Sequence, residues 1–167
     1  MRVAIPAALA AATLAVPLAG CGGSAEASAD RAKIQREADL YAIEQLEVKW
    51  HRAASTQNVD LVMSLFAPDA TLTLGTETLK GKAQIRDFFV HKSAPYQPGN
   101  HWVSETPAYK IKTTVDGEKG TLRFECHYVD PKTGKVALIS GGDNAVQKIG
   151  GRWLITNVAP LTATLTP

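Results

Sequence analysis

Two long segments of alternating apolar and polar residues, joined by Gly150-Gly151, constrain the fold of this chain more than any other feature. They are KVALISGGDNAVQKI, residues 135–149, and RWLITNVAPLTATL, residues 152–165. A pair of glycines between two such segments is typical of a tight β-hairpin, because glycine readily adopts the positive φ angles that the turn needs. We therefore expect an antiparallel hairpin at this end of the chain.

The segment LRFECHYV also alternates, which predicts a strand with one buried face. The apolar face consists of Leu122, Phe124, Cys126 and Tyr128, and the other face of Arg123, Glu125 and His127. Residues 101–112 predict a long strand that Pro107 must bend, because proline has no N–H to donate. DGEKG, residues 116–120, and DPKTGK, residues 130–135, are turns between strands, and this context argues against calcium or phosphate loops.

Apolar residues recur at helical spacing in residues 40–55, which predicts a helix that buries one stripe. The stripe consists of Ile43, Leu46, Trp50, Ala53 and Ala54. Asp30 or Asp39 is the expected cap of this helix. Helices followed by an antiparallel meander indicate an α+β domain with its helices packed on one face of the sheet.

Two shorter helices are expected before the meander begins. Asn58 can cap the first, over residues 59–66, after which Pro68-Asp69 should turn the chain into the strand TLTLG. The second covers residues 82–92, and its buried face consists of Ile85, Phe88 and Phe89. The next segment, SAPYQPGN, is rich in turn-forming residues and predicts a loop.

The chain begins with the features of a secretory signal: Arg2, then an uncharged apolar segment, then small residues. Pro6 and Pro17 interrupt the apolar segment, which is shorter than the roughly 20 residues that a membrane-spanning helix needs. Leu18-Ala19-Gly20-Cys21 resembles the lipobox of bacterial lipoproteins, in which the cysteine thiol receives diacylglycerol and the preceding peptide bond is cut. An ordinary secretory site with a chance cysteine is the alternative.

The lipobox resemblance implies three parts: a signal peptide over 1–20, lipidated Cys21 with a flexible tether over 21–37, and a folded domain over 38–167. The mature protein is then expected outside the cytoplasm, anchored to the cell membrane through Cys21. Cys126 is the other cysteine, so no intramolecular disulfide can form once Cys21 carries lipid. We expect Cys126 to be a small buried hydrophobic residue, with a reactive thiol as the alternative.

Charge argues against a nucleic-acid partner. Removal of residues 1–20 removes only Arg2, so the formal net charge falls from +2 to +1. HExxH motifs, serine nucleophile elbows, P-loops and CxxC pairs do not occur, so we expect no metal and no cofactor.

The segments AIEQLEVKWHRAASTQNVDLVMSLFAPDATLTLG, GKAQIRDFF and DNAVQKIGGRWLITNV together resemble the SnoaL-like branch of the nuclear transport factor two-like superfamily. The resemblance covers about residues 38 to 160. It implies a cone in which a strongly curved antiparallel sheet wraps around the helices and leaves an apolar pocket. It also implies a homodimer formed through the exposed sheet face. Such cones host isomerases, dehydratases, cyclases, hydrolases and binding modules, so function has to be argued from the site.

Ketosteroid isomerase, an enzyme of this superfamily, carries its proton-shuttling carboxylate at a position that corresponds here to Leu74. Because leucine cannot move a proton, the resemblance argues against that reaction. Its hydrogen-bond donor to the developing oxyanion corresponds to Asp143, eight residues before Gly151. A carboxyl group in an apolar pocket can stay protonated and donate in this way. The alternative is that Asp143 follows a β-bulge at Gly141-Gly142 and faces water.

His101 and His127 lie 26 positions apart, close to the separation of the catalytic histidines of scytalone dehydratase, which shares this superfamily. The aromatic hydroxyls and the carboxylate that assist those histidines are replaced here by approximately Ala54, Ser55 and Leu74. Strand parity places His127 on the solvent side unless a bulge reverses the register. His101 is the better candidate, at the pocket mouth. His51 and His91 are assigned to helix surfaces.

Two hypotheses follow. The first is a lipid-anchored cone that binds a small apolar ligand or a partner protein. The second is a proton-transfer enzyme of isomerase, dehydratase or cyclase type that uses Asp143 and His101. In both, the residues expected to line the pocket are Trp50, Leu72, Leu74, Phe89, Trp102 and Tyr128.

Overall fold

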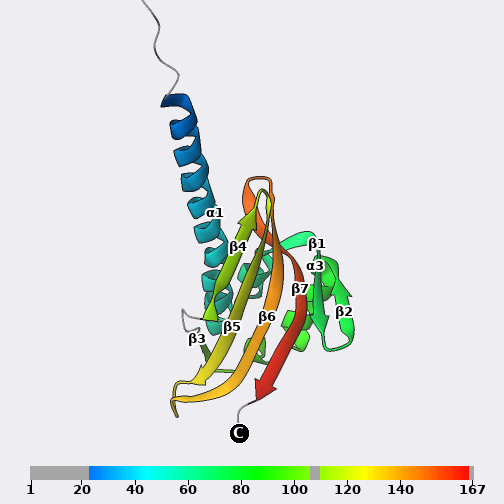
Figure 1. The fold of residues 1–167 in the computed structure, drawn as a ribbon. Coiled ribbons are helices and arrows are strands. Elements are labelled where there is room, and N and C mark those ends of the chain that lie inside the picture. The colour runs from blue at the N-terminus through cyan, green and yellow to red at the C-terminus, as the bar shows by residue number, and fades with distance from the viewer. Residues whose placement is uncertain (1–22, 106–109, 166–167) are drawn as a thin grey trace, which may run out of the picture.

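The computed structural model describes residues 23–105 and 110–165 as three α-helices, one 3-10 helix and seven strands (Figure 1). The helices are α1 (Gly23–Ser55), α2 (Val59–Met63), α3 (Gly81–His91) and the 3-10 helix η1 (Ala94–Tyr96). The strands are β1 (Phe66–Leu74), β2 (Glu77–Lys80), β3 (Val103–Glu105), β4 (Lys112–Asp116), β5 (Lys119–Asp130), β6 (Lys135–Ile149) and β7 (Arg152–Leu165). The segment expected to be a signal peptide and Cys21 lie outside the described residues.

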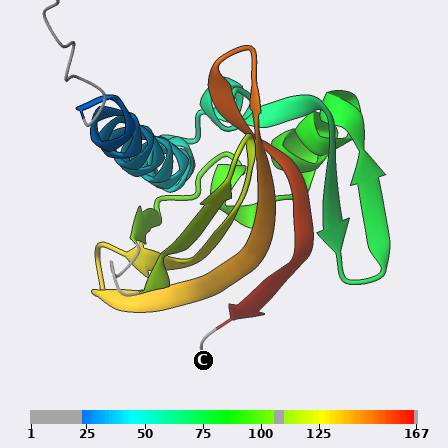
Figure 2. The ribbon, with the colours of Figure 1, turned by 45° about the horizontal axis from the view of Figure 1, so that its top comes forward.

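The strands form one sheet in the order β2-β1-β7-β6-β5-β3, and β4 pairs with the same β5 that β3 joins. All neighbours are antiparallel except β1 and β7, which run parallel. The long strands β5, β6 and β7 bend strongly, and the sheet curves around α2, α3 and the second half of α1 (Figure 2). The expected α+β cone, a curved sheet wrapped around N-terminal helices, is therefore confirmed.

The hairpin predicted at Gly150-Gly151 joins β6 to β7, and both glycines have positive φ angles, 56° and 77°. The buried face predicted for β5 is also confirmed, because Leu122, Phe124, Cys126 and Tyr128 are all at least 96% buried. The long strand expected over residues 101–112 is instead two strands, β3 and β4, which pair with the same edge of β5. Pro107 lies outside the described residues.

The first helix differs most from expectation. α1 begins at Gly23, so the segment expected to be a flexible tether is helical, and neither Asp30 nor Asp39 caps the helix. Alanine, glutamate, arginine and lysine dominate the segment after Ser24, and their helix propensities outweigh the effect of the small polar residues. Residues 25–38 are exposed on every side, and the buried stripe begins only at Asp39.

The short elements after α1 follow the sequence closely. Asn58 caps α2, since its side chain accepts a 2.8 Å hydrogen bond from the Leu61 amide. α2 is shorter than expected, because the Leu65 carbonyl already accepts a sheet-type bond from the Ile155 amide. Pro68-Asp69, expected to turn the chain into the strand, instead lies within β1, where the β1–β7 register shifts, which suits a residue with no N–H to donate.

The core fills the space between the concave face of the sheet and the helices. Trp50 is at its centre, with ring centroids 5.4–5.8 Å from those of Phe66, Phe89 and Phe124. Trp153 is buried as well, and its indole N–H donates to Asp39 Oδ1 at 2.8 Å. Lys148 donates to the same oxygen at 2.7 Å, which ties the β6–β7 hairpin to α1.

Candidate functional site

A pocket with a largely apolar lining opens between the concave face of the sheet, α1, α3 and the segment that follows α3. Its volume is about 490 Å³, within the range of small-molecule sites. The lining residues are Trp50, Leu74, Gly75, Phe88, Phe89, Lys92, Ser93, Ala94, Pro95, Tyr128, Leu138 and Ser140. Aromatic and aliphatic side chains form most of the wall, and we call this hollow the cone pocket.

Trp50 gives the cone pocket an unusual polar group. The side chain packs among aromatic rings, so its indole Nε1 is buried, and no acceptor among the described residues meets it at full hydrogen-bond geometry, although the Tyr128 hydroxyl lies close enough to interact with it. A buried N–H without a partner is costly, and most such groups in folded proteins are paired. The hydroxyl of Tyr96, whose ring lies 5.0 Å from that of Phe89, is also buried without a partner among the described residues.

Tyr128 and Ser140 reach the cone pocket from β5 and β6. Tyr128 is 3% exposed, and burial raises the pKa of its hydroxyl well above the ordinary value, with the nearby Cys126 and Tyr96 adding to the shift. The hydroxyl therefore stays neutral and keeps its proton available for a hydrogen bond. Ser140 interacts with both Tyr128 and Cys126, and Trp50 interacts with Tyr128, which links the pocket wall to the residues behind it.

Behind this wall lies a buried cluster that we call the His51 cluster, made of Glu47, His51, Ser104 and Cys126. Glu47 Oε1 lies 3.0 Å and Cys126 Sγ 3.1 Å from His51 Nε2, and Ser104 Oγ lies 2.9 Å from His51 Nδ1. All four residues are at most 8% exposed. α1 supplies Glu47 and His51 one turn apart, while β3 and β5 bring the other two.

Both nitrogens of the His51 imidazole meet polar partners in the cluster. Nε2 lies beside the Glu47 carboxyl group, which can accept a hydrogen bond from a ring N–H. The Ser104 hydroxyl can donate to Nδ1 or accept from it. The imidazole is therefore held at both ring nitrogens.

Cys126 belongs to the same cluster but does not behave as a reactive thiol. Burial raises the pKa of its thiol, and the charge of Glu47 raises it further, against hydrogen bonds with Ser104, Tyr128 and Ser140. Because the thiolate is the nucleophilic form, a thiol of this kind is inert. In the part of the chain that the structure describes, no three His, Cys, Asp or Glu side chains are arranged to hold a metal ion.

Four of the six residues expected to line a pocket line the cone pocket: Trp50, Leu74, Phe89 and Tyr128. Leu72 is fully buried in the core. Trp102 is half-buried against the core and is absent from the pocket lining.

Asp143, expected as a hydrogen-bond donor in the pocket, lies on the outer face of the sheet. Its side chain is 68% exposed, and Oδ1 lies 3.4 Å from Arg123 Nε on the neighbouring strand. The alternating register explains the position, because Asn144 is the buried neighbour and donates to the Leu122 carbonyl. Asp143 therefore faces water, as the bulge alternative anticipated.

His101 lies in the loop before β3, and its Nε2 is 3.4 Å from Asp130 Oδ1. A backbone hydrogen bond from Lys132 is the main reason that the pKa of Asp130 is lowered, and His101 contributes. The ion-pair partners of the two expected catalytic residues, Arg123 for Asp143 and Asp130 for His101, are seven positions apart on β5, which corresponds to about 23 Å. The structure therefore does not bring Asp143 and His101 together.

His127 lies on the outer face, as strand parity predicts. Its Nε2 is 2.5 Å from Glu125 Oε1, and Lys110 Nζ lies 3.4 Å from the other oxygen. The hydrogen bond with His127 is the main cause of a lowered pKa of Glu125. This group faces away from the cone pocket and shares no residue with it.

Assigning His51 to a helix surface was wrong, because the residue is 8% exposed and fully engaged. Its signal was available: His51 directly follows Trp50 and lies one turn after Glu47, so it borders the apolar stripe. A polar residue at the edge of a buried stripe enters the core when strands bring partners to it. No local sequence pattern predicted that Ser104 and Cys126 would be those partners.

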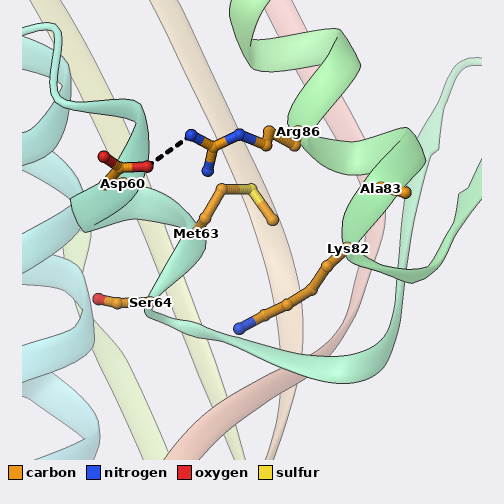
Figure 3. A pocket seen from close by; sticks show the side chains of 6 residues that line it. All are labelled: Asp60, Met63, Ser64, Lys82, Ala83 and Arg86. Carbon is orange, nitrogen blue, oxygen red and sulfur yellow. Dashed lines mark hydrogen bonds and ion pairs between the residues drawn. The ribbon is translucent and has the colours of Figure 1, made fainter.

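A second, shallower hollow of about 360 Å³ lies between α2 and α3 (Figure 3). Arg86 and Lys82 lie on either side of Met63, and Arg86 forms an ion pair with Asp60 at 2.5 Å (Figure 3). The pair neutralises the arginine, and both of its side chains are at least half exposed. This hollow therefore has the chemistry of an ordinary polar surface.

The comparison with protein families decides the membership of the chain. The model of the SnoaL-like domain matches residues 35–159. The chain belongs to the SnoaL-like domain family. The match covers the second half of α1 and the whole described sheet up to β7, and so includes both the cone pocket and the His51 cluster. No match was found among curated proteins.

Solved structures share the fold at low sequence identity. An NTF2-like protein with a cystatin-like fold from Novosphingobium aromaticivorans superimposes with a TM-score of 0.65 at 14% identity, over 87% of this chain and 92% of that one. An NTF2-like protein from Pseudomonas putida gives 0.64 at 13%, over 75% and 87%. A ketosteroid isomerase-like protein from Erwinia carotovora gives 0.56 at 16%, over 77% and 98%. These likenesses establish the SnoaL-like cone fold.

Proposed function

We propose that this SnoaL-like protein binds a small, largely apolar molecule in the cone pocket while anchored to the bacterial cell membrane through lipid on Cys21. The observation that carries the binding proposal is the buried indole N–H of Trp50, which has no acceptor at full hydrogen-bond geometry in the wall of an apolar pocket of about 490 Å³. Pockets with apolar walls and a few placed polar groups are the usual sites of small-molecule binding.

The polar groups of the pocket narrow the class of ligand. Trp50 Nε1 can only donate, and Tyr128 keeps its proton, so the inner wall offers donors to an acceptor atom. Lys92 is the one charged residue of the pocket lining, and it is exposed at the rim. A buried charge on the ligand would therefore lack a partner. The ligand that fits best is uncharged and apolar, and carries a carbonyl, ether or hydroxyl oxygen at the end that enters first.

Native mass spectrometry of protein purified from its own membranes tests this proposal. The wild type should carry a small molecule, and Ala94→Trp should reduce its occupancy at least tenfold, because Ala94 lines the pocket. Ala145→Trp is the matched control, an exposed alanine on the outer side of the sheet, and should retain the molecule. Equal occupancy in the two variants, or an empty wild type, would overturn the proposal.

The membrane location is supported by Leu18-Ala19-Gly20-Cys21 at the end of an apolar leader. In the described part of the chain, no helix has both the length and the apolar character needed to cross a membrane. Cys21→Ser should abolish acylation, so that the protein no longer partitions with membranes as a processed species. Continued recovery of a cleaved, lipid-modified variant would contradict the anchor.

A proton-transfer enzyme is the second candidate, and the His51 cluster is the observation that favours it. His51 and Glu47 are buried together at 3.0 Å, and Cys126 connects them to Tyr128 and Ser140 in the pocket wall. Such a chain can hold a proton beside a bound carbonyl compound. If the protein is such an enzyme, carbon-bound hydrogen in the co-purified ligand should exchange for deuterium in D₂O, and the His51→Gln variant should lose this exchange. If the protein only binds the ligand, no exchange is expected.

A further inference from the structure

Three of the five exposed large hydrophobic side chains in the described chain lie on α1, which is unexpected for a helix of a monomeric domain. Ile34, Tyr41 and Val48 have exposed fractions of 70%, 64% and 50%. They are spaced by seven residues, almost two full turns, so they form one stripe along the helix. Single exposed hydrophobic residues are common, whereas an aligned stripe marks a contact surface.

The stripe begins on a part of α1 that nothing else supports. Residues 25–38 are exposed on all sides, so this stretch has no tertiary contact to hold it in helical form (Figure 1). Isolated helices of this length are marginal in water, and most helical stability in proteins comes from packing of an apolar face. A helix packed on the stripe would supply the missing contacts along both halves of α1.

Charged residues beside the stripe indicate which helix packs on it and whether that helix runs parallel or antiparallel. One flank carries the acidic row Asp30, Glu37 and Glu44, again spaced by seven. The other flank carries Gln35, Ala42 and Lys49. If a second α1 packed antiparallel, the acidic rows of the two helices would face each other and repel. In a parallel pair, the acidic row of each helix faces the flank of the other helix that carries Gln35 and Lys49, so that Glu44 meets Lys49 of the second copy.

We propose that two copies of this chain pair through α1 as a parallel pair of helices, with Ile34, Tyr41 and Val48 at the seam. The residues that α1 buries in its own domain, among them Ile43 and Trp50, are on the opposite side of the helix, so the two domains lie outside the pair. A parallel pair also brings both N-terminal ends to the same side. Two anchored chains can then share one membrane, which raises their effective concentration and makes a short seam sufficient.

Cysteine cross-linking in native membranes tests the seam. Ile34→Cys and Val48→Cys, each in the full-length chain, should give cross-linked dimers with a short bis-maleimide, because like positions face each other in a parallel pair. Arg36→Cys is the matched control, exposed on the other side of the same helix, and its yield should be at least tenfold lower. The parent chain reports any contribution from Cys21 and Cys126.

Three results would overturn the proposal. Ile34→Cys could give no more dimer than Arg36→Cys. Chains with Ile34→Cys could cross-link to chains with Val48→Cys more than to themselves, which indicates an antiparallel pair. The products could contain a different protein. As a second test, Ile34→Glu should lower the dimer yield of Val48→Cys at least fivefold while the exposed position leaves folding intact, and an unchanged yield would contradict the seam.

Discussion

The two faces of β5 carry similar chemistry in different surroundings. On the inner face, Cys126 meets the buried pair of His51 and Glu47. On the outer face, Glu125 and His127 form the same type of pair, but their side chains are 31% and 21% exposed. Water can screen and replace the outer contacts, whereas the inner groups are buried and depend on their protein partners. A carboxylate and an imidazole in contact therefore indicate a site only when burial makes that contact hard to replace.

The largest expected effect is on the aromatic centre of the inner face. Trp50→Ala should lower the free energy of unfolding by about 3–5 kcal/mol, because it removes a buried ring packed on three others. Ile149→Ala, at a partly exposed apolar position, should cost less than about 1 kcal/mol. Equilibrium unfolding in urea measures both. A similar cost for the two variants would show that the core is misassigned.

The second prediction compares the two carboxylates directly. Glu47→Gln should cost about 2–3 kcal/mol, because it weakens a buried contact whose partner has no water to replace it. Glu125→Gln, on the outer face, should cost less than about 1 kcal/mol. Urea midpoints at pH 7 test the difference. If the two costs are equal, the two faces do not differ in the way described above.

A third prediction concerns Asp39, at the junction of α1 with the β6–β7 hairpin. Burial alone would raise its pKa, but hydrogen bonds from Lys148, Trp153 and Gln35 outweigh burial and lower it below the ordinary value of 3.8. A lowered folded-state pKa stabilises the fold above that value, and the contribution disappears as pH falls through the folded-state pKa. Asp39→Asn should cost about 1–2 kcal/mol at pH 7 and progressively less below pH 3.8. A cost that does not change with pH would contradict this account.

The smallest effect is expected at Asp143. Its ion pair with Arg123 is solvent-exposed, so Asp143→Asn should change the free energy of unfolding by less than about 0.5 kcal/mol. Occupancy of the co-purified ligand should also stay unchanged, because the residue is outside the pocket lining. Loss of the ligand in this variant would show that Asp143 belongs to the binding site and would contradict the difference between the two faces.

Local patterns predicted much of this fold and less of its site. The alternation in β5, the glycines of the β6–β7 hairpin and the Asn58 cap are each readable over a few residues, and each was predicted. The beginning of α1 was not, because Gly22, Gly23 and the serines suggested a tether while the alanines and charged residues between them favour a helix. Only a small difference in free energy decides whether this segment is a helix or a flexible tether.

The site depends on contacts between distant segments, and this is why its polar part escaped prediction. Periodicity placed Trp50, Phe89 and Tyr128 on buried faces, and the family resemblance supplied the pocket that they were expected to line. His51 meets Cys126 across 75 positions and Ser104 across 53, through the pairing of β3 with β5. Asp143 was chosen by counting from one hairpin, and a single position separates an outward residue from the buried Asn144.

The most direct test of the pocket is the nitrogen-proton NMR signal of the Trp50 indole, one of three tryptophans in the chain. Protein freed of ligand would be titrated with an extract of its own membranes and, separately, with 1-acetylnaphthalene, a neutral apolar carbonyl compound. The Trp50 signal should shift downfield as its N–H, which has no acceptor at full hydrogen-bond geometry, gains one from the ligand, while the Trp153 signal, already bonded to Asp39, stays in place. A Trp50 signal that moves in neither titration would contradict the pocket as the ligand site.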